Sequence, residues 1–341
     1  MKVVQLHEYG GPDVLLYEDA PKPIPTSGEV LIKVESASVN FADVVRRNND
    51  PYPFPSPLPF IPGSEVAGIV EAIGEDVTTV SVGSTVFASL ENGGAGGYAQ
   101  YAVAKVGKVI PLPEGMTPDQ ACSLVIAGMT ALQTLTDCAQ LQPGETVLVQ
   151  AAGGGVGTYA VQLAKLLGAG KVIAAASTPA KRELALKLGA DAAIDYTADD
   201  WVKVVRDLTG GKGVDVVLEA TGGDVLVQSI QAMAPFGRII VFGAASRERK
   251  PVNPYSMLGM NQSLITYYVG GWFQSRPQQA IAALRKLIGF ITTGKINVQI
   301  GHILPLSEAA EAHRILAARA SAGKIILKPW SEIWGGDHRN S

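Results

Sequence analysis

The chain has 341 residues, a length that accommodates two domains at roughly 150 residues each. Hydrophobic residues make up 47% of the sequence and charged residues 17%, a balance that supports a large buried core and excludes a disordered chain. The net charge is −3 without any basic run, so a nucleic-acid-binding surface is not indicated.

The cysteines and histidines argue against a metal site or a disulfide framework. The sequence has two cysteines and four histidines, and they form neither a CxxC pair nor a set at metal-ligand spacing. No apolar run reaches ~18 residues, and the first residues lack the pattern of a signal peptide. We therefore expect a metal-free, cytoplasmic protein without a membrane span.

The first third of the chain is predicted to be mostly β. Residues 30–37 and 68–73 have strand-like patterns and are bounded by Pro and Gly. Residues 51–62 contain prolines at alternate positions, which exclude a helix or a central strand because each proline lacks a backbone donor and fixes φ. This segment is predicted to be an irregular loop, either a solvated linker or a docked loop. Its aromatic residues, Tyr52, Phe54 and Phe60, favour docking.

From about residue 124, strand-like apolar runs alternate with helix-length segments, with glycines at the joints. The predicted strands cover 145–150, 171–175, 214–218 and 238–242, and the predicted helices cover 156–167, 180–188 and 224–233. Such alternation is typical of a doubly wound parallel α/β sheet of the Rossmann type.

After about residue 263 the pattern becomes mixed again. Helices are predicted over 278–290 and 307–318, and strands over 300–304 and 324–327. We therefore expect residues 124–263 to form a dinucleotide-binding domain, and residues 1–123 with 264–330 to form the other domain. Residues 331–341 lack apolar periodicity and are predicted to form a flexible tail.

A glycine-rich loop follows the first predicted strand of the α/β domain and opens its first helix. Its sequence, Ala151-Ala152-Gly153-Gly154-Gly155-Val156-Gly157, fits the dinucleotide pattern A-x-G-x-x-G. In this frame Ala152 makes the turn, Gly154 admits a pyrophosphate, and Gly157 lets the helix lie close to the strand. The strand–loop–helix context favours dinucleotide binding over a purely structural turn.

The end of the second predicted strand favours NADP over NAD. An NAD site normally places Asp or Glu about 20 residues after the loop, where it binds the ribose hydroxyls. Here that position is Ala176, followed by Ser177 and, soon after, by Lys181 and Arg182. A small neutral residue with a hydroxyl and two cations suits a 2′-phosphate. The alternative is that both cations are only solvated on the next helix.

A second glycine pattern carries a family resemblance that extends over residues 1–329. Residues 63–68, Gly-Ser-Glu-Val-Ala-Gly, with Gly74 and Val77, resemble the zinc-alcohol-dehydrogenase signature of the medium-chain dehydrogenase/reductase superfamily. The signature's His is replaced by Ser64, and the first zinc-ligating Cys would fall near Val39. The structural zinc lobe is absent. Within the superfamily, the chain resembles the zinc-free quinone oxidoreductase (zeta-crystallin-like) family.

The resemblance implies an α/β fold with a Rossmann domain that binds NADPH, plus a mostly β, GroES-like catalytic domain. Without a Lewis acid to polarise a ketone, hydride is expected to pass to an electron-poor acceptor such as a quinone. The implied activity is that of an NADPH-dependent, zinc-independent quinone oxidoreductase. An enone or 2-enoyl reductase is the alternative within the superfamily. A non-catalytic NADPH-binding sensor or structural protein is the alternative from another class.

The cofactor site is assigned from the resemblance and from the rule that parallel sheets bind ligands at the carboxyl ends of their strands. The predicted set is Asn40, Thr130, Gly154, Gly155, Val156, Gly157, Ser177, Lys181, Tyr196, Phe242, Gly243 and Arg319. The resemblance places Lys181, Tyr196 and Arg319 around the 2′-phosphate. Gly155 and Val156 are expected to hold the pyrophosphate through their amides.

The predicted catalytic residues are Asn40 and Tyr52. The resemblance places Asn40 beside the nicotinamide and substrate, where its amide could orient the acceptor oxygen. Tyr52 could donate a proton, although a packing role is favoured for it. Asp43 is expected to be a local cap or ion-pair partner rather than a general acid. Thr130 is either a nicotinamide contact or a helix cap.

The expected partners are a small-molecule quinone or enone and a second copy of the chain. Residues 264–269, Leu-Ile-Thr-Tyr-Tyr-Val, are predicted to form an edge strand that could pair across a two-fold axis. A homodimer is therefore expected.

Overall fold

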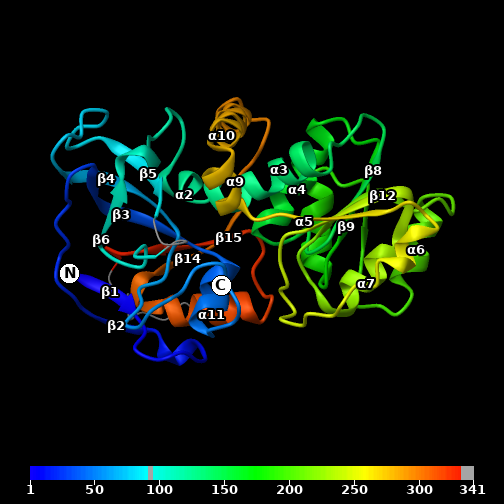
Figure 1. Ribbon diagram of the computed structural model, residues 1–341, viewed down its shortest axis with the longest axis horizontal. Helices are drawn as coiled ribbons and strands as arrows, with labels where there is room; N and C mark the ends of the chain where they lie inside the picture. The colour runs from blue at the N-terminus through cyan, green and yellow to red at the C-terminus, as the bar shows by residue number, and fades with distance from the viewer. Residues whose placement is uncertain (91–94, 332–341) are drawn as a thin grey trace, which may run out of the picture. The chain divides into compact units, whose positions relative to one another are not determined.

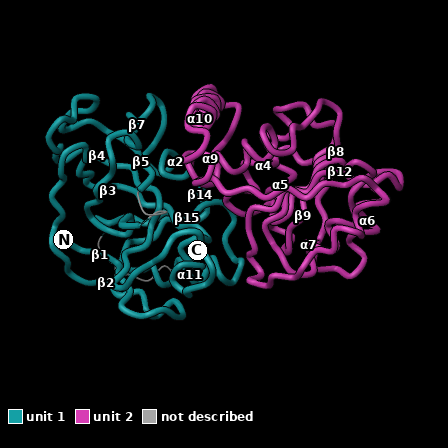
Figure 2. The backbone as a smooth tube through the Cα atoms, in the orientation of Figure 1, with its two compact units in different colours: residues 1–123, 300–341 teal, residues 124–299 magenta. Residues whose placement is uncertain are grey.

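The computed structural model describes residues 1–90 and 95–331, and the chain folds into two units (Figures 1 and 2). Unit 1 comprises Met1–Ser123 and Ile300–Ser341, and unit 2 comprises Leu124–Gln299. The predicted tail, 331–341, lies outside the described residues except for Ser331.

The placement of residues 264–299 in the first domain is wrong, because they belong to unit 2. Strand β13 (Ser263–Thr266) hydrogen-bonds to the sheet of unit 2. Helix α10 (Pro277–Thr292) places Leu287 against Gly128 of the same unit, so closely that a Cβ on Gly128 would lie 2.6 Å from the leucine Cδ2. The sequence shows the change in periodicity near residue 263 but not the surface against which the next helix packs.

Unit 1 is built on a largely antiparallel sheet centred on β3 (Glu29–Val39). The strand order is β14-β15-β3-β4-β5-β7, and β6 also pairs with β3. The further strands are β4 (Glu65–Ile73), β5 (Thr85–Ser89), β6 (Tyr101–Lys105), β7 (Val109–Pro111), β14 (Ile300–Pro305) and β15 (Lys324–Lys328). A separate pair is formed by β1 (Lys2–Gln5) and β2 (Leu16–Asp19). The predicted mostly β domain is thereby confirmed.

One pairing in this sheet joins the two parts of the chain that form unit 1. Strand β15 runs antiparallel to the end of β3, with Ile325 opposite Val39. This register brings Lys324 beside Asn40, which begins helix α1 (Phe41–Arg47). The other helices of the unit are α2 (Pro118–Ala121) and α11 (Ala309–Ala317).

The proline-rich segment 51–62 contains neither helix nor extended strand, as predicted, and it is docked. Arg46, from α1, is buried beneath it and donates from Nε to the Ser56 hydroxyl at 2.7 Å and from an Nη to the carbonyl of Pro55 at 3.1 Å. The Arg46 guanidinium also faces the ring of Phe60 at 4.3 Å. The docked-loop alternative is the correct one, because a buried cation holds the loop to the core.

Unit 2 contains a six-stranded, wholly parallel sheet with the order β10-β9-β8-β11-β12-β13. The remaining strands are β8 (Thr146–Val149), β9 (Lys171–Ala175), β10 (Ala192–Ile194), β11 (Val214–Glu219) and β12 (Met233–Val241). The helices are α3 (Met129–Gln133), α4 (Gly155–Leu166), α5 (Pro179–Lys187), α6 (Trp201–Leu208), α7 (Gly223–Ala232), α8 (Tyr255–Leu258), α9 (Val269–Ser275) and α10.

This order confirms the Rossmann-type domain, and it places the point where chain order reverses between β8 and β11. Ligands bind outside the carboxyl ends of the strands at such a point. The predicted edge strand 264–269 is shorter in the structure, since β13 ends at Thr266 and α9 begins at Val269.

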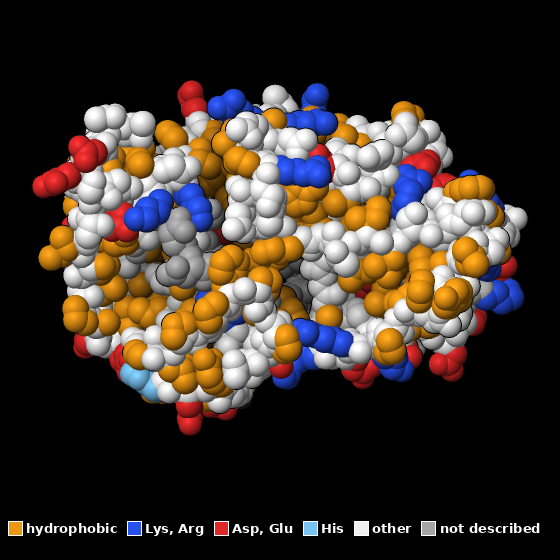
Figure 3. Space-filling model, viewed as in Figure 1, with side chains coloured by type: hydrophobic (Ala, Val, Ile, Leu, Met, Phe, Trp, Pro, Cys, Tyr) orange, Lys and Arg blue, Asp and Glu red, His pale blue; other side chains and the backbone are white. Residues whose placement is uncertain are grey.

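On the face drawn in Figure 3, Lys and Arg side chains lie in several separate places, with Asp and Glu side chains beside some of them. Within the described ranges, no helix has both the length and the apolar character required to cross a bilayer.

Candidate functional site

The glycine-rich loop joins the carboxyl end of β8 to the first turn of α4. Gly154 caps α4, its N–H donates to the carbonyl of Ala151 at 2.9 Å, and its own carbonyl accepts from Thr158 N–H at 2.9 Å. Residues 150–153 form the turn, which includes Ala152 as predicted, and Ala151 within it has φ of +50°. Ala152 donates its N–H to Ala175 of β9 at 3.0 Å, which ties the loop to the sheet.

Two glycines of this loop are required by close approach. A Cβ on Gly157 would lie 2.6 Å from Cα of Ala152, closer than two carbon atoms can pack. A Cβ on Gly153 would lie 2.7 Å from Cβ of Lys181, so the stem of Lys181 lies against the loop. The glycines thus let α4 and Lys181 lie close against the loop, where α4 presents its unbonded amides and positive dipole end.

The predicted 2′-phosphate residues of unit 2 gather at the same edge of the sheet. Ser177 follows β9, Lys181 lies in the first turn of α5, and Tyr196 follows β10, the strand next to β9. Lys181 and Tyr196 are buried, and Ser177 is half-buried. Because β8, β9 and β10 are parallel neighbours, their carboxyl ends bring these side chains towards the glycine loop.

Arg182 is not equivalent to Lys181. Its Nη1 donates to the carbonyl of Ala176 at 2.9 Å and lies 2.8 Å from a carboxylate oxygen of Asp195. This cation is therefore already engaged in closing the loop after β9. Of the two cations considered from the sequence, Lys181 is the one whose stem lies on the glycine loop.

The other predicted cofactor residues occupy different places. Phe242 and Gly243 follow β12 at the carboxyl edge, where the Phe242 N–H donates to Glu219 at 3.0 Å. Thr130 lies within α3 and is not its cap, since Gly128 holds that position. Arg319 is an exposed residue of unit 1, after α11, with φ of +55°, so unit 2 does not itself contain it.

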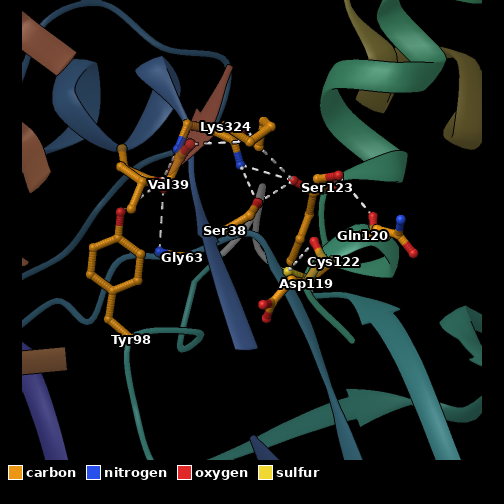
Figure 4. A network of polar contacts seen from close by, with 12 residues as sticks. Ser38, Val39, Gly63, Tyr98, Asp119, Gln120, Cys122, Ser123 and Lys324 are labelled. Carbon is orange, nitrogen blue, oxygen red and sulfur yellow. Dashed lines mark hydrogen bonds and ion pairs between the residues drawn. The ribbon is translucent and has the colours of Figure 1, made fainter. Parts of the chain in front are cut away.

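In unit 1, Asn40 is buried and belongs to a polar network that includes Ser38 and Lys324, two of the residues labelled in Figure 4. Its Nδ2 donates to Ser38 Oγ at 3.2 Å and to Glu65 Oε2 at 3.0 Å, and its Oδ1 accepts from Lys324 Nζ at 2.7 Å. Both hydrogens of the amide are thus bonded within the protein. The expected role of Asn40, to orient an acceptor oxygen, stays a prediction, and these contacts fix the orientation of its amide.

Tyr52 lies in the docked loop and is half-buried, with its ring 5.3 Å from the guanidinium carbon of Arg46. Stacking on a buried arginine is the packing role that the sequence favours for this residue. The structure does not bring Tyr52 into the network of Asn40 through any of the contacts described here.

A second buried network begins one helical turn after Asn40 and was not foreseen from the sequence. Asp43 Oδ2 accepts from the N–H of Asn40 at 2.9 Å and from the Tyr98 hydroxyl at 3.1 Å. Tyr98 Oη also lies 3.1 Å from Nε2 of His313, whose Nδ1 lies 3.1 Å from Nη1 of Arg47. Because arginine can only donate, Nδ1 accepts and Nε2 carries the ring proton of neutral His313, donating to Tyr98. Asp43 is therefore the local cap that was predicted.

Comparison with known proteins identifies the family to which this arrangement belongs. The family model "Alcohol dehydrogenase GroES-like domain" matches residues 26–114, and the model "Zinc-binding dehydrogenase" matches residues 155–286. A quinone oxidoreductase of Pseudomonas aeruginosa is 37% identical over 96% of this chain and 99% of its own length. The chain belongs to the quinone oxidoreductase family of the medium-chain dehydrogenases/reductases.

Two further similarities refine this assignment. A 2-haloacrylate reductase from a Burkholderia species is 34% identical over 95% of this chain and 98% of its own length. The structure of the Escherichia coli quinone oxidoreductase complexed with NADPH matches with a TM-score of 0.89 at 30% identity, covering 96% of this chain and 100% of that one. The predicted family, fold class and oxidoreductase character are confirmed.

This quinone oxidoreductase family member departs from the zinc enzymes at the signature itself. Ser64, in place of the signature's His, is buried, and its carbonyl accepts from the N–H of Leu90, the residue after β5, at 2.9 Å. In the part of the chain that the structure describes, no three His, Cys, Asp or Glu side chains gather into a group that could hold a metal ion.

Sequence reasoning missed Lys324 and His313 as members of these buried networks. Lys324 is 284 residues from Asn40, and His313 is 215 residues from Tyr98. In the sequence each looks like an ordinary member of a terminal strand or helix. Only Glu65, within the signature, carried a signal that could have drawn attention to the network.

The buried pair Asp43 and His313 predicts opposing pH effects on stability. Burial raises the pKa of Asp43 to about 6, while the N–H of Asn40 and the Tyr98 hydroxyl partly offset the rise; burial and Arg47 lower the pKa of His313 to about 3. As pH falls below 6, native Asp43 takes a proton before its unfolded form does, which stabilises the fold. As pH falls below the ordinary 6.5 of His, only the unfolded state protonates His313, which destabilises the fold.

We therefore expect the two slopes, each at most about 1.4 kcal/mol per pH unit, to oppose each other between pH 6 and 4. Measured relative to the wild type, the free energy of unfolding of Asp43→Asn should fall by about 2 kcal/mol as the pH is lowered from 6 to 4. That of His313→Gln should rise by about 2 kcal/mol over the same change. Urea unfolding at both ends of the interval checks the signs. Parallel pH profiles for all three proteins would contradict the assignment.

Proposed function

We propose that this chain transfers hydride from NADPH to a quinone without the help of zinc. The observation that carries the proposal is the similarity to quinone oxidoreductases over 96% of the chain. In unit 2, the stem of Lys181 also lies against the glycine loop. Reduced nicotinamide supplies the hydride when it is bound, and a quinone is electron-poor enough to accept it without a Lewis acid.

The residues present fit NADPH. Helix α4 begins directly after Gly154 of the glycine loop, and its first amides and positive dipole end suit a pyrophosphate. At the end of β9 the residue is Ala176, which offers no carboxylate to the ribose hydroxyls. Ser177, Lys181 and Tyr196 would hold the adenosine 2′-phosphate; Arg319, which the resemblance also assigns to it, belongs to unit 1.

In the reaction, the task of the protein is to bind, orient and exclude water rather than to form a covalent bond. Unit 2 would hold the cofactor by its phosphates. In unit 1, the polar groups around Asn40 are already bonded to one another, which fixes their geometry. The hydroquinone oxygens need no protein acid, because water can protonate them.

A second candidate is reduction of an activated C=C bond, and the 34% identity to a 2-haloacrylate reductase is the observation that supports it. That reaction needs a proton donor at the carbon next to the carbonyl. In this chain the donor would be Tyr52 or a bound water. We favour the quinone because it makes no such demand.

Steady-state NADPH oxidation with a panel of quinones, enones, 2-haloacrylates and enoyl thioesters separates the two candidates. We expect kcat/KM for 1,4-benzoquinone to exceed that for any C=C substrate by about tenfold or more, since the quinone requires no acid. A higher value for a haloacrylate or enone would transfer the proposal to the second candidate. Metal analysis of the same protein should find no stoichiometric zinc, and finding it would refute the zinc-free mechanism.

We further propose that the protein is cytoplasmic and forms a homodimer. The edge strand β13 pairs only with β12 within the described chain, so its other edge is available to a second copy. Leu264 of this strand and nearby Leu258 and Phe236 are exposed apolar side chains, as an isologous interface requires.

A further inference from the structure

Lys324 is a buried lysine whose ammonium ends among polar groups instead of reaching solvent. Lys324 is 3% exposed and lies at the start of β15. Nζ donates to Asn40 Oδ1 at 2.7 Å and to the carbonyl of Val39 at 3.3 Å, and it lies 3.9 Å from Glu65 Oε2 (Figure 4). Burying an ammonium is costly, so these contacts must offset its lost hydration.

The opposite charge in this network belongs to Glu65, which is fully buried on β4. Its Oε2 accepts from Ser38 Oγ at 2.7 Å and from Asn40 Nδ2 at 3.0 Å. The amide of Asn40 therefore lies between a cation and an anion, with its oxygen towards the ammonium and its nitrogen towards the carboxylate. A flipped amide would put hydrogens against the ammonium and oxygen against the carboxylate, so the two charges determine its orientation.

The backbone of Asn40 is fixed as well, because its N–H donates to Asp43 at the first turn of α1. Lys324 thus acts on the residue that joins the central strand of unit 1 to α1, and α1 in turn carries Arg46, which holds the docked proline-rich loop. Positional errors of about 1 Å around a reacting pair can lower the rate by ~100-fold.

We propose that Lys324, together with Glu65, is a positioning residue of the hydride-transfer site: its ammonium holds the Asn40 side chain in one orientation. The inference rests on the proposed function, since it takes Asn40 as a residue of that site. Near Val39 and Ser64, where zinc members of the superfamily supply metal ligands, this chain instead places an internal ammonium bonded to Val39 O. The positive charge beside Val39 is therefore that of Lys324, at the start of β15.

The test compares Lys324→Met, Asn40→Ala and the double variant in quinone reduction and in NADPH binding followed by nicotinamide fluorescence. Lys324→Met keeps most of the stem volume and removes the charge. We expect kcat for 1,4-benzoquinone to fall by about tenfold to 100-fold, with the Kd for NADPH within about threefold of the wild type. Because Lys324 acts through Asn40, the double variant should be no slower than Asn40→Ala alone.

A matched control is Lys328→Met, on the same strand, whose Nζ bonds Ser36 Oγ at 2.9 Å and pairs with Asp119 but does not contact Asn40. Lys328→Met should keep kcat within about twofold of the wild-type value. Where Lys324→Met fails to fold, Glu65→Gln/Lys324→Met removes both buried charges together, which folds more readily than removing one. This neutral pair should also show the lowered kcat.

An active wild type whose kcat is unchanged by Lys324→Met, or by the neutral pair, would overturn the positioning role. Fully multiplicative losses in the double variant would do the same, since they would show that Lys324 does not act through Asn40. A wild type that binds NADPH but reduces no acceptor would instead overturn the proposed function, so the two failures are distinguishable.

Discussion

Replacing Gly157 by alanine should weaken NADPH binding by about 100-fold or more, equivalent to about 2.7 kcal/mol. The new Cβ would lie 2.6 Å from Cα of Ala152 and closer still to the carbonyl oxygen of Ala151, and both neighbours are backbone. The first turn of α4 must therefore move away from the loop, which displaces the amides that would hold the pyrophosphate. The binding constant is measured by fluorescence of the reduced nicotinamide or by calorimetry.

Gly289→Ala provides the matched control in the same unit. Gly289 lies within α10, where a Cβ would meet nothing within 4 Å, so alanine should be neutral or slightly stabilising. Circular dichroism and thermal unfolding establish that both variants fold. NADPH binding by folded Gly157→Ala within about threefold of the wild type would show that the loop does not hold the cofactor.

Lys181→Ala should raise the Kd of NADPH by about 30- to 100-fold while changing that of NADH by about threefold or less. The two cofactors differ only in the 2′-phosphate, and a hydrogen bond to such a charged group is worth about 1.5–3 kcal/mol. The stem of Lys181 rests on Gly153, so truncation to alanine also removes packing beside the loop. Lys181→Met separates the two effects because it retains a stem of similar length without the charge.

Arg182→Ala is the control for a cation of the same helix. Its guanidinium bonds Ala176 O and Asp195, so its loss should loosen the loop after β9 and affect both cofactors alike. Equal losses of NADPH and NADH affinity in Lys181→Met would rule out the assignment of Lys181 to the 2′-phosphate.

Much of the fold could be predicted from the sequence because local patterns determine it. The buried parallel strands are continuous apolar runs, and the glycine loop combines a strand, a turn and a helix N-terminus within a few residues. β10, with three residues, has too short a pattern to be recognised, and α6 follows it without a glycine motif.

The contacts around Asn40 could not be predicted, because they depend on pairing across the whole chain. The register of β15 against β3 brings Lys324 to Asn40, and the docking of α11 brings His313 to Tyr98. Neither lysine nor histidine changes the apolar periodicity of its element. The same limit explains residues 264–299, whose periodicity shows a helix but not that Leu287 packs on Gly128.

The most direct test of hydride transfer to a quinone is a single turnover of the NADPH complex. The complex of metal-analysed protein is mixed rapidly with 1,4-benzoquinone, and the absorbance of the reduced nicotinamide is followed. We predict a decay far faster than the reaction in buffer, slowed when the transferred hydrogen is deuterium, and lost in Gly157→Ala. Bound NADPH that decays no faster with the protein than without it would contradict the proposed activity.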